Sequence, residues 1–435
     1  MNIKLHTICF IIFLSALCVP LYSQEEQDQS QPTEQSQPQE YFPLSLKGYL
    51  KQLNTFIPVS QYSLTGEKKY LNASLTRFRL TPEFMTQSGN VIIHADCDNE
   101  LIFGNYLDTG EFSRIWESRT YNDLYPSSHT AYSSTDFFDQ LKLQRAYIKM
   151  SAGDFIFTAG RQQIRFGSGK LWNPLDALNP VSPSAFEGAD EQKGTDAIRL
   201  EYYPEQTTEI AVIINPKRKD DTLSRKNCMD AGNALLRAKT TFFNIEAAVI
   251  AGRIAQRYTG GADISFIVFD GMLRGSTLYS RPKKEKYFIQ ANCGYEYTFT
   301  VGSGLTVIAE YFYNSASINT RKEILNAYVM DSMSGTNQKT YETLSNRALT
   351  YNRHYAGLAL SYAPVPLLQT NVLIIADTQG RAVSASPSIT YNLEQELDLF
   401  IGAISAYQKK NAEKTSDFTE YNRKAAVYAG MQWWL

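Results

Sequence analysis

Arginine side chains recur in the middle of the chain at a spacing that suits anion binding. Arg161, Gln163 and Arg165 alternate along one short segment, so in an extended strand they share one face. Arg145 lies on the preceding candidate strand and is expected on the same side of a hairpin. Because arginine binds carboxylates and phosphates through paired hydrogen bonds, this row predicts a basic, solute-facing wall. The alternative is that the arginines pair with carboxylates of facing strands.

Acidic side chains and a histidine also alternate, along 91–101. His94, Asp96, Asp98 and Glu100 share one face, with neighbouring side chains about 7 Å apart, from a rise near 3.4 Å per residue. That spacing is wide for the ligands of one ion, so we predict a polar strand face and no metal site. A calcium site is the alternative. Asp96 and Asp98, together with Glu310, are also candidate ion-pair partners for the arginines.

Few residues offer catalytic chemistry. The chain has four histidines, and His94 with Asp96 forms the one close acid–histidine pair in the sequence, as a triad would need. No Gly-x-Ser-x-Gly motif, nucleotide-binding loop or haem motif occurs. We therefore expect neither an enzyme nor a cofactor.

Short alternating segments follow one another from Leu44 to Leu435 and predict an all-β chain of eighteen strands. The expected strands are 44–54, 71–86, 91–103, 137–150, 155–166, 195–203, 207–215, 231–239, 242–252, 262–269, 272–280, 286–299, 305–315, 353–363, 368–377, 382–391, 397–407 and 423–435. Sixteen strands are the alternative, if the pair around Asp270 is absent.

The connections between these strands differ in length by side. Every connection from an even to an odd strand is expected to be short; the turns are Gln87–Asn90, Ser151–Asp154, Pro204–Gln206, Thr240–Thr241, Asp270–Gly271, Thr300–Gly304, Pro364–Leu367 and Asn392–Glu396. Long gaps fall on the opposite side, at 104–136, 167–194, 216–230 and 316–352. Short periplasmic turns and longer outer loops are typical of a transmembrane antiparallel β-barrel of the bacterial outer membrane.

Composition agrees with a barrel and excludes other classes. No later stretch reaches the roughly 20 apolar residues that a membrane helix needs, and aromatic residues make up 13% of the chain, which suits two aromatic girdles in contact with outer-membrane lipid. The formal net charge of −2 gives no basic surplus for nucleic acid. Cys97, Cys228 and Cys293 have no spacing of a metal or disulfide framework.

The two ends of the chain carry targeting signals. Residues 1–23 have a basic start and a short apolar run, which predict a secretory signal peptide; a lipoprotein cysteine at Cys18 is the alternative. Residues 24–43 are rich in Gln, Glu, Ser and Pro and are expected to be a disordered periplasmic segment before the barrel of 44–435. Val427, Met431, Trp433 and Leu435 alternate at the carboxyl end, as in proteins that the outer-membrane assembly machinery inserts, although Leu435 replaces the usual terminal aromatic residue.

The gap at 167–194 carries Trp172, Asn173 and Asp176, and prolines stiffen it. After an outgoing strand, such a loop can fold into the barrel and narrow it. Packing on the outer rim is the alternative.

The segment Gly160–Pro180, GRQQIRFGSGKLWNPLDALNP, resembles the Gly-Arg-Gln … Gly-x-Gly … Trp-Asn-Pro-x-Asp stretch of porin-like outer-membrane proteins, a broad group that includes the alginate-export type. Leu143–Tyr147 and Ala309–Asn314 add to the resemblance. It implies transport of an anionic solute, with loop charges facing basic wall residues.

We therefore expect a channel for passive or selective diffusion of small polar, anionic solutes. Arg145, Arg161 and Arg165, with Gln163 beside them, are the candidate wall, and Trp172, Asn173 and Asp176 the candidate constriction. A polysaccharide exporter is one alternative. A surface adhesin using the loops at 104–136 and 316–352 is another.

Overall fold

The computed structural model describes residues 43–58, 70–109, 112, 124–125, 127–176, 178, 194–216, 232–254, 257–282, 287–317, 350–410 and 416–435. These residues form nineteen strands and one short 3₁₀ helix, η2 (Thr419–Tyr421). The strands are β1 (Leu44–Pro58), β2 (Tyr70–Met85), β3 (Val91–Phe103), β4 (Ser128–Ser133), β5 (Phe137–Ala152), β6 (Phe155–Gln162), β7 (Thr195–Glu205), β8 (Thr208–Asn215), β9 (Asn233–Phe242), β10 (Ile245–Ile254), β11 (Arg257–Val268), β12 (Gly271–Pro282), β13 (Phe288–Phe299), β14 (Leu305–Asn314), β15 (His354–Val365), β16 (Leu368–Asp377), β17 (Ala382–Glu394), β18 (Leu397–Gln408) and β19 (Ala425–Trp434).

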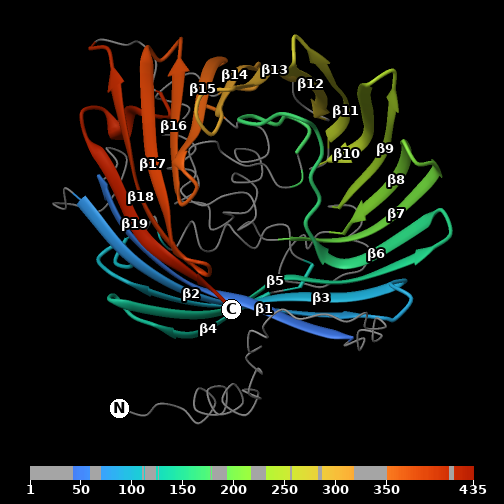
Figure 1. Cartoon of the computed structure of the whole chain (residues 1–435), viewed down its shortest axis with the longest axis horizontal. Helices are drawn as coiled ribbons and strands as arrows, with labels where there is room; N and C mark the ends of the chain where they lie inside the picture. Colours follow the sequence, from blue (N-terminus) through green and yellow to red (C-terminus); the bar gives the residue numbers. More distant parts are fainter. Residues whose placement is uncertain are drawn as a thin grey trace, which may run out of the picture. The chain divides into compact units, whose positions relative to one another are not determined.

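The strands form one antiparallel sheet that closes on itself (Figure 1). Closure is made by β1, which pairs with β2 on one edge and with β19 on the other; Lys51 lies opposite Arg77 and opposite Gln432. A closed barrel satisfies every strand's backbone groups without water, which is what a lipid environment requires. No helix within the described residues is long and apolar enough to cross a membrane.

The two faces of the wall differ in chemistry. Large apolar side chains such as Val249, Ile264 and Ile401 are exposed on the outward face, whereas charged side chains such as Arg77 and Asp98 are buried on the inward face. This alternation follows the period of two of a strand. Because a soluble protein rarely exposes so large an apolar surface, the outward belt fits lipid.

The expected eighteen strands are all present, and two details of the prediction are wrong. A further strand, β4, lies between β3 and β5 in the chain and pairs with the outer half of β5. In addition, β6 ends at Gln162 rather than at Phe166. The two differences are connected, because β6 pairs with β5 only from Ala146 to Ala152, and β4 covers the edge of β5 beyond it. The barrel wall therefore has eighteen strand positions. At one of them β6 pairs with one end of β5, and β4 pairs with the other end on the same edge.

Two turns are displaced from their predicted places, the first toward the carboxyl end and the second by one residue toward the amino end. Thr240 and Thr241 belong to β9, and the turn is Phe243-Asn244, with φ of 45° and 61°. The turn between β11 and β12 is Phe269-Asp270, with φ of 47° and 59°. Positive φ at both central residues is the signature of the type I′ turn that suits two-residue hairpins.

All eight connections predicted to be short are short, but the opposite side is mixed. The connection between β10 and β11 there spans only residues 255–256, and that between β16 and β17 spans 378–381. The expected signal peptide and most of the 24–43 segment lie outside the described residues, and β1 begins at Leu44.

Candidate functional site: a loop across the barrel

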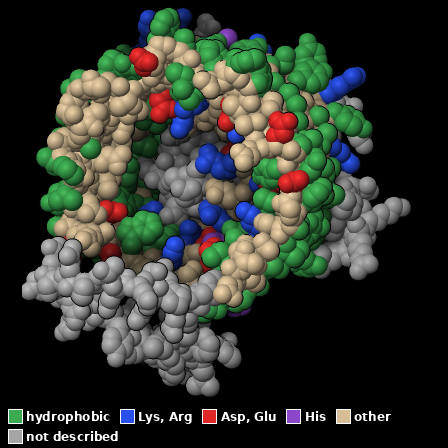
Figure 2. Space-filling model, turned by 45° about the vertical axis from the view of Figure 1, so that its right-hand side comes forward, with side chains coloured by type: hydrophobic (Ala, Val, Ile, Leu, Met, Phe, Trp, Pro, Cys, Tyr) green, Lys and Arg blue, Asp and Glu red, His purple; other side chains and the backbone are tan. Residues whose placement is uncertain are grey.

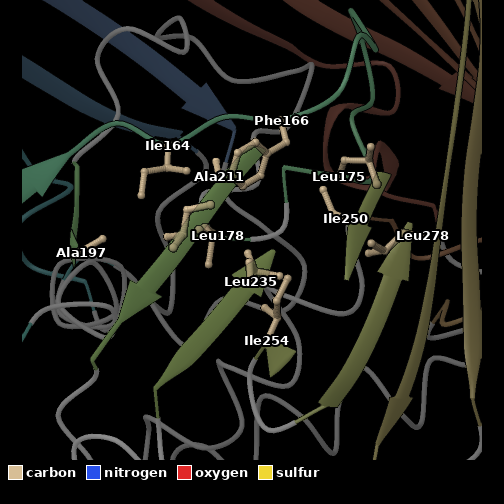
Figure 3. Packing of buried hydrophobic residues seen from close by; sticks show 11 residues of the cluster. Ile164, Phe166, Leu175, Leu178, Ala197, Ala211, Leu235, Ile250, Ile254 and Leu278 are labelled. Atoms are coloured by element: carbon tan, nitrogen blue, oxygen red, sulfur yellow. The ribbon is translucent and has the colours of Figure 1, made fainter. Parts of the chain in front are cut away.

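The chain leaves the wall after Gln162 and enters the barrel; in Figure 1 this is the green trace between β6 and β7. Its apolar side chains Ile164, Phe166, Leu175 and Leu178 are buried against inward residues of β7 to β12. Figure 3 shows them over Ala211, Leu235, Ile250 and Leu278. Burying these side chains on the inner wall is what draws the loop inward.

The middle of the same loop reaches a second part of the wall. Trp172 is 2% exposed and stacks on Phe312 of β14, with ring centroids 5.6 Å apart and an angle of 6° between the planes. Tyr355 of β15 lies 6.1 Å from the Trp172 ring. The described part of the loop, 163–176 and 178, therefore runs from the β7–β12 wall to the β14–β17 wall and lies inside the barrel. Residues 179–193 are outside the described residues.

Wall carboxylates hold the backbone of the loop. Glu310 on β14 accepts hydrogen bonds from the backbone N–H groups of Lys170, Leu171 and Trp172, at 3.0, 3.3 and 2.7 Å. Hydrogen bonds to a charged acceptor are stronger than neutral ones. Glu310 was considered from sequence as a partner for arginines; the structure instead places it on the backbone of the loop.

Two further wall side chains bind the same turn. Asp263 on β11 accepts from the backbone N–H and the hydroxyl of Ser168, at 3.0 and 2.8 Å. Asn292 on β13 donates to the carbonyl of Trp172 at 2.9 Å. Three strands thus hold residues 168–172, and nothing in the sequence around Asp263 or Asn292 indicated this role, because it depends on contacts across the barrel.

Glycines of the wall make room for the loop. A Cβ on Gly357 of β15 would lie 2.5 Å from Leu171 Cδ1 and 2.9 Å from Trp172 Cζ3. A Cβ on Gly261 of β11 would overlap Leu175 Cδ2. Since real Cβ contacts are much longer, the loop fits only because these wall positions lack side chains. The loop is therefore a fixed part of the barrel interior.

Arg165 and Asp176 form an ion pair within the loop. Arg165 Nε lies 3.2 Å from Asp176 Oδ2; the arginine side chain is 41% exposed and the aspartate 2%. Burial raises the pKa of the Asp176 carboxyl to about 7, while the charge of Arg165 opposes that rise. The pair therefore presents a guanidinium to the barrel interior and keeps its carboxylate inside the loop. The other charged side chains of the loop, Glu187, Asp190, Glu191 and Lys193, lie outside the described residues.

The arginines expected on one face do not share one. Gln163 and Arg165 belong to the loop, because β6 ends at Gln162. Arg161 has the strand parity of Phe155 and Phe157, which is the outward face, and is buried there in a paired contact with Asp196 at 2.8 and 2.7 Å. The predicted alignment of Arg161 with Arg165 was wrong, because the sequence continues to alternate between polar and apolar residues after the chain has left the sheet.

The remaining candidates do lie inside. Arg145 on β5 is inward-facing, with its Nε 3.6 Å from Asp96 Oδ2. Asn173 is in the loop and donates from its amide to the carbonyl of Phe166. Trp172 and Asp176 are too buried to contact a solute directly, so they shape the loop and leave its charged surface to Arg165 and Lys170, whose side chain is 47% exposed.

Ion pairs join β2, β3 and β5, as in the alternative that pairs arginines with Asp96 and Asp98, and they involve Arg77 and Arg79 as well as Arg145. Arg79 binds Asp98 through two hydrogen bonds of 2.6 and 2.7 Å, and Arg77 lies 2.7 Å from Glu100. His94 lies between Glu83 and Asp96, at 3.0 and 3.2 Å. The alternating acidic face is thus occupied by arginines and by its own histidine. Among the described residues no group of three or more His, Cys, Asp or Glu has the geometry of a metal site.

Solved structures show which proteins share this architecture. OccK9 (OpdG) of Pseudomonas aeruginosa matches with a TM-score of 0.56 and 12% identity, over 90% of this chain and 98% of that one. The fold is that of an outer-membrane porin. A BenF-like porin from Pseudomonas fluorescens Pf-5 matches this porin fold with a TM-score of 0.52 and 10% identity, and Pseudomonas aeruginosa OpdK, solved with vanillate, with 0.50 and 10%; both cover 90% of this chain and 98% of their own. No family model and no curated protein sequence matches the chain.

Proposed function

We propose that this porin-fold protein is a bacterial outer-membrane channel through which small polar, anionic solutes diffuse passively. The observation that carries the proposal is the loop of residues 163–178, which crosses a closed barrel and turns the Arg165 guanidinium toward its interior. A wall charge at a narrow place selects ions by sign.

The charges around the loop support an anionic preference. Arg165 and Lys170 are the exposed cations of its described part, and Arg145 is 20% exposed on the inner face of β5. The carboxylate that balances Arg165 is buried in the loop, where it cannot repel a passing anion at contact. Figure 2 looks into the hollow of the barrel, where Lys and Arg side chains are visible together with Asp and Glu side chains.

One structurally similar protein supports the class of solute. OpdK was solved with vanillate, an aromatic carboxylate. A carboxylate of that size could form the paired hydrogen bonds that a guanidinium offers. We therefore propose small carboxylates as the first solutes to test on this chain.

The reversal potential across a planar bilayer in a salt gradient tests the selectivity. We expect anion preference in the unaltered channel and its marked reduction in Arg165→Gln, because the variant removes a charge at the constriction while keeping side-chain length. Arg281→Gln is the matched control, since Arg281 is exposed at the outer end of β12 opposite Tyr258. Equal selectivity in the two variants would contradict the role of Arg165.

A further inference from the structure

Exposed cations gather on one arc of the barrel's long-loop end. Arg381, Lys409, Lys410, Arg423 and Lys424 are all exposed, and they lie at the ends of β17, β18 and β19. We call these five residues the basic rim. Likeness to a porin does not require such a cluster, and the channel interior does not use it.

Backbone contacts bring the basic rim together. The backbone N–H of Lys409 donates to the carbonyl of Arg381 at 3.1 Å, and that of Arg423 donates to Ala406 at 2.9 Å. The carbonyl of Lys424 accepts from the hydroxyl of Ser405 at 2.9 Å. Residues from three separate parts of the chain are thus fixed side by side.

The basic rim continues directly into the outward apolar belt. The Arg423 guanidinium lies over the Tyr407 ring, 5.9 Å from its centroid. Tyr407 is 55% exposed, and its register partner Val383 is 46% exposed. The surface changes from an apolar wall to an aromatic ring and then to a cluster of cations. This order matches a lipid, whose apolar acyl chains lead to an anionic headgroup.

No ion pair joins any residue of the basic rim to a carboxylate among the described residues. Two carboxylates nearby are used otherwise: Asp377 accepts from the backbone N–H of Gly380 at 2.9 Å, and Asp417 accepts from that of Tyr351 at 3.2 Å. The opposite end has the reverse charge. None of the eight short connections carries Lys or Arg, and Asp154, Asp270 and Glu396 lie in them.

We propose that the basic rim binds the phosphate group of an anionic lipid in the outer leaflet, with the lipid's acyl chains on the adjoining apolar wall. Charge complementarity and continuity with the apolar belt carry this assignment. It does not depend on the proposed channel function, because the site lies on the outside of the barrel. A cluster of cations that forms no ion pair among the described residues attracts a phosphate, and each Lys or Arg near the surface strengthens binding by roughly fivefold.

Native mass spectrometry of the folded, detergent-solubilised protein tests the site, with phosphatidic acid as the probe and phosphatidylcholine of the same chains as the reference. We expect retention of phosphatidic acid in preference to phosphatidylcholine. The variant Arg381→Gln, Lys409→Gln, Arg423→Gln, Lys424→Gln should lose that preference. The matched control Asp154→Asn, Asp270→Asn, Glu394→Gln, Glu396→Gln changes as many charges at the other end and should keep it.

Two further arms keep the test decisive. Arg423→Lys retains the charge and should keep the preference even if the fourfold variant fails to form a heat-modifiable barrel, whereas Arg423→Gln should weaken it about fivefold. Millimolar inorganic phosphate should not displace the lipid. Displacement by free phosphate, or equal lipid retention by the fourfold variant and the control, would overturn the proposal.

Discussion

Asp176 titrates close to neutral pH, because burial raises the pKa of its carboxyl to about 7 against the opposing charge of Arg165. Above that pH the pair is neutral overall. Below it Asp176 holds a proton, and the pair carries the single positive charge of Arg165. The same raised pKa means that the folded state binds more protons than the unfolded one between about pH 4 and 7, so Asp176 makes the fold less stable as pH rises through that window.

The preference for anions should therefore rise as pH falls from 8 to 6. In Asp176→Asn the residue is neutral at every pH, so selectivity should be independent of pH over this range and should match that of the unaltered protein at pH 6. Reversal potentials measured at several pH values for both proteins test this pH dependence of selectivity. A pH dependence that survives in Asp176→Asn would show that another group titrates in the pore.

The loop that crosses the barrel depends on the Glu310 carboxylate. Glu310→Gln keeps the shape of the side chain but removes its charge and one acceptor oxygen. Hydrogen bonds to charged groups contribute about 1.5–3 kcal/mol each, so we expect the loop to lose a few kcal/mol of local stability. Unit conductance should rise and become noisier, and proteolysis should cut within 163–178.

Glu246→Gln is the control for that change. Glu246 faces the interior from β10, where it pairs with Lys239 at 2.8 Å, and no hydrogen bond joins it to the described loop. Conductance in this variant should stay as in the unaltered protein. If Glu310→Gln behaved like Glu246→Gln, packing alone would hold the loop.

Sequence alternation predicted the wall strands well and the loop poorly. Residues 163–166 alternate polar and apolar like a strand, but Ile164 and Phe166 pack on the inner wall because the chain has left the sheet. Period-two patterns report an extended chain with one apolar face and do not report a hydrogen-bonded neighbour. For the same reason the pattern placed Arg161 and Arg165 on one strand face, although Arg165 lies beyond the end of β6.

Closure of the whole barrel depends on a seam between the first and last strands. Gly430 of β19 lies there, and a Cβ on it would overlap the Gln52 carbonyl oxygen of β1 and lie 2.6 Å from Phe400 Cζ. Gly430→Val should therefore prevent closure and abolish the heat-modifiable band on a gel. Gly260→Val is the control, because a Cβ there meets nothing closer than 3.9 Å. A heat-modifiable band for Gly430→Val would mean that the seam can shift.

At the scale of the molecule, strand number, parity and the short turns could be read from the sequence because each depends on local pattern. The contacts that hold the loop inside the barrel could not. Glu310, Asp263 and Asn292 lie far from the loop in sequence and meet it only because the barrel closes. Contacts between residues so far apart in the sequence produce no periodic pattern in a single sequence.

Single-channel conductance of the refolded mature protein in a planar bilayer tests the central claim most directly. A barrel that is open beside its inner loop should give discrete, steady steps of conductance that scale with salt concentration. A heat-modifiable, correctly folded barrel that gives no steps would contradict a channel and would favour a plugged barrel or a surface adhesin.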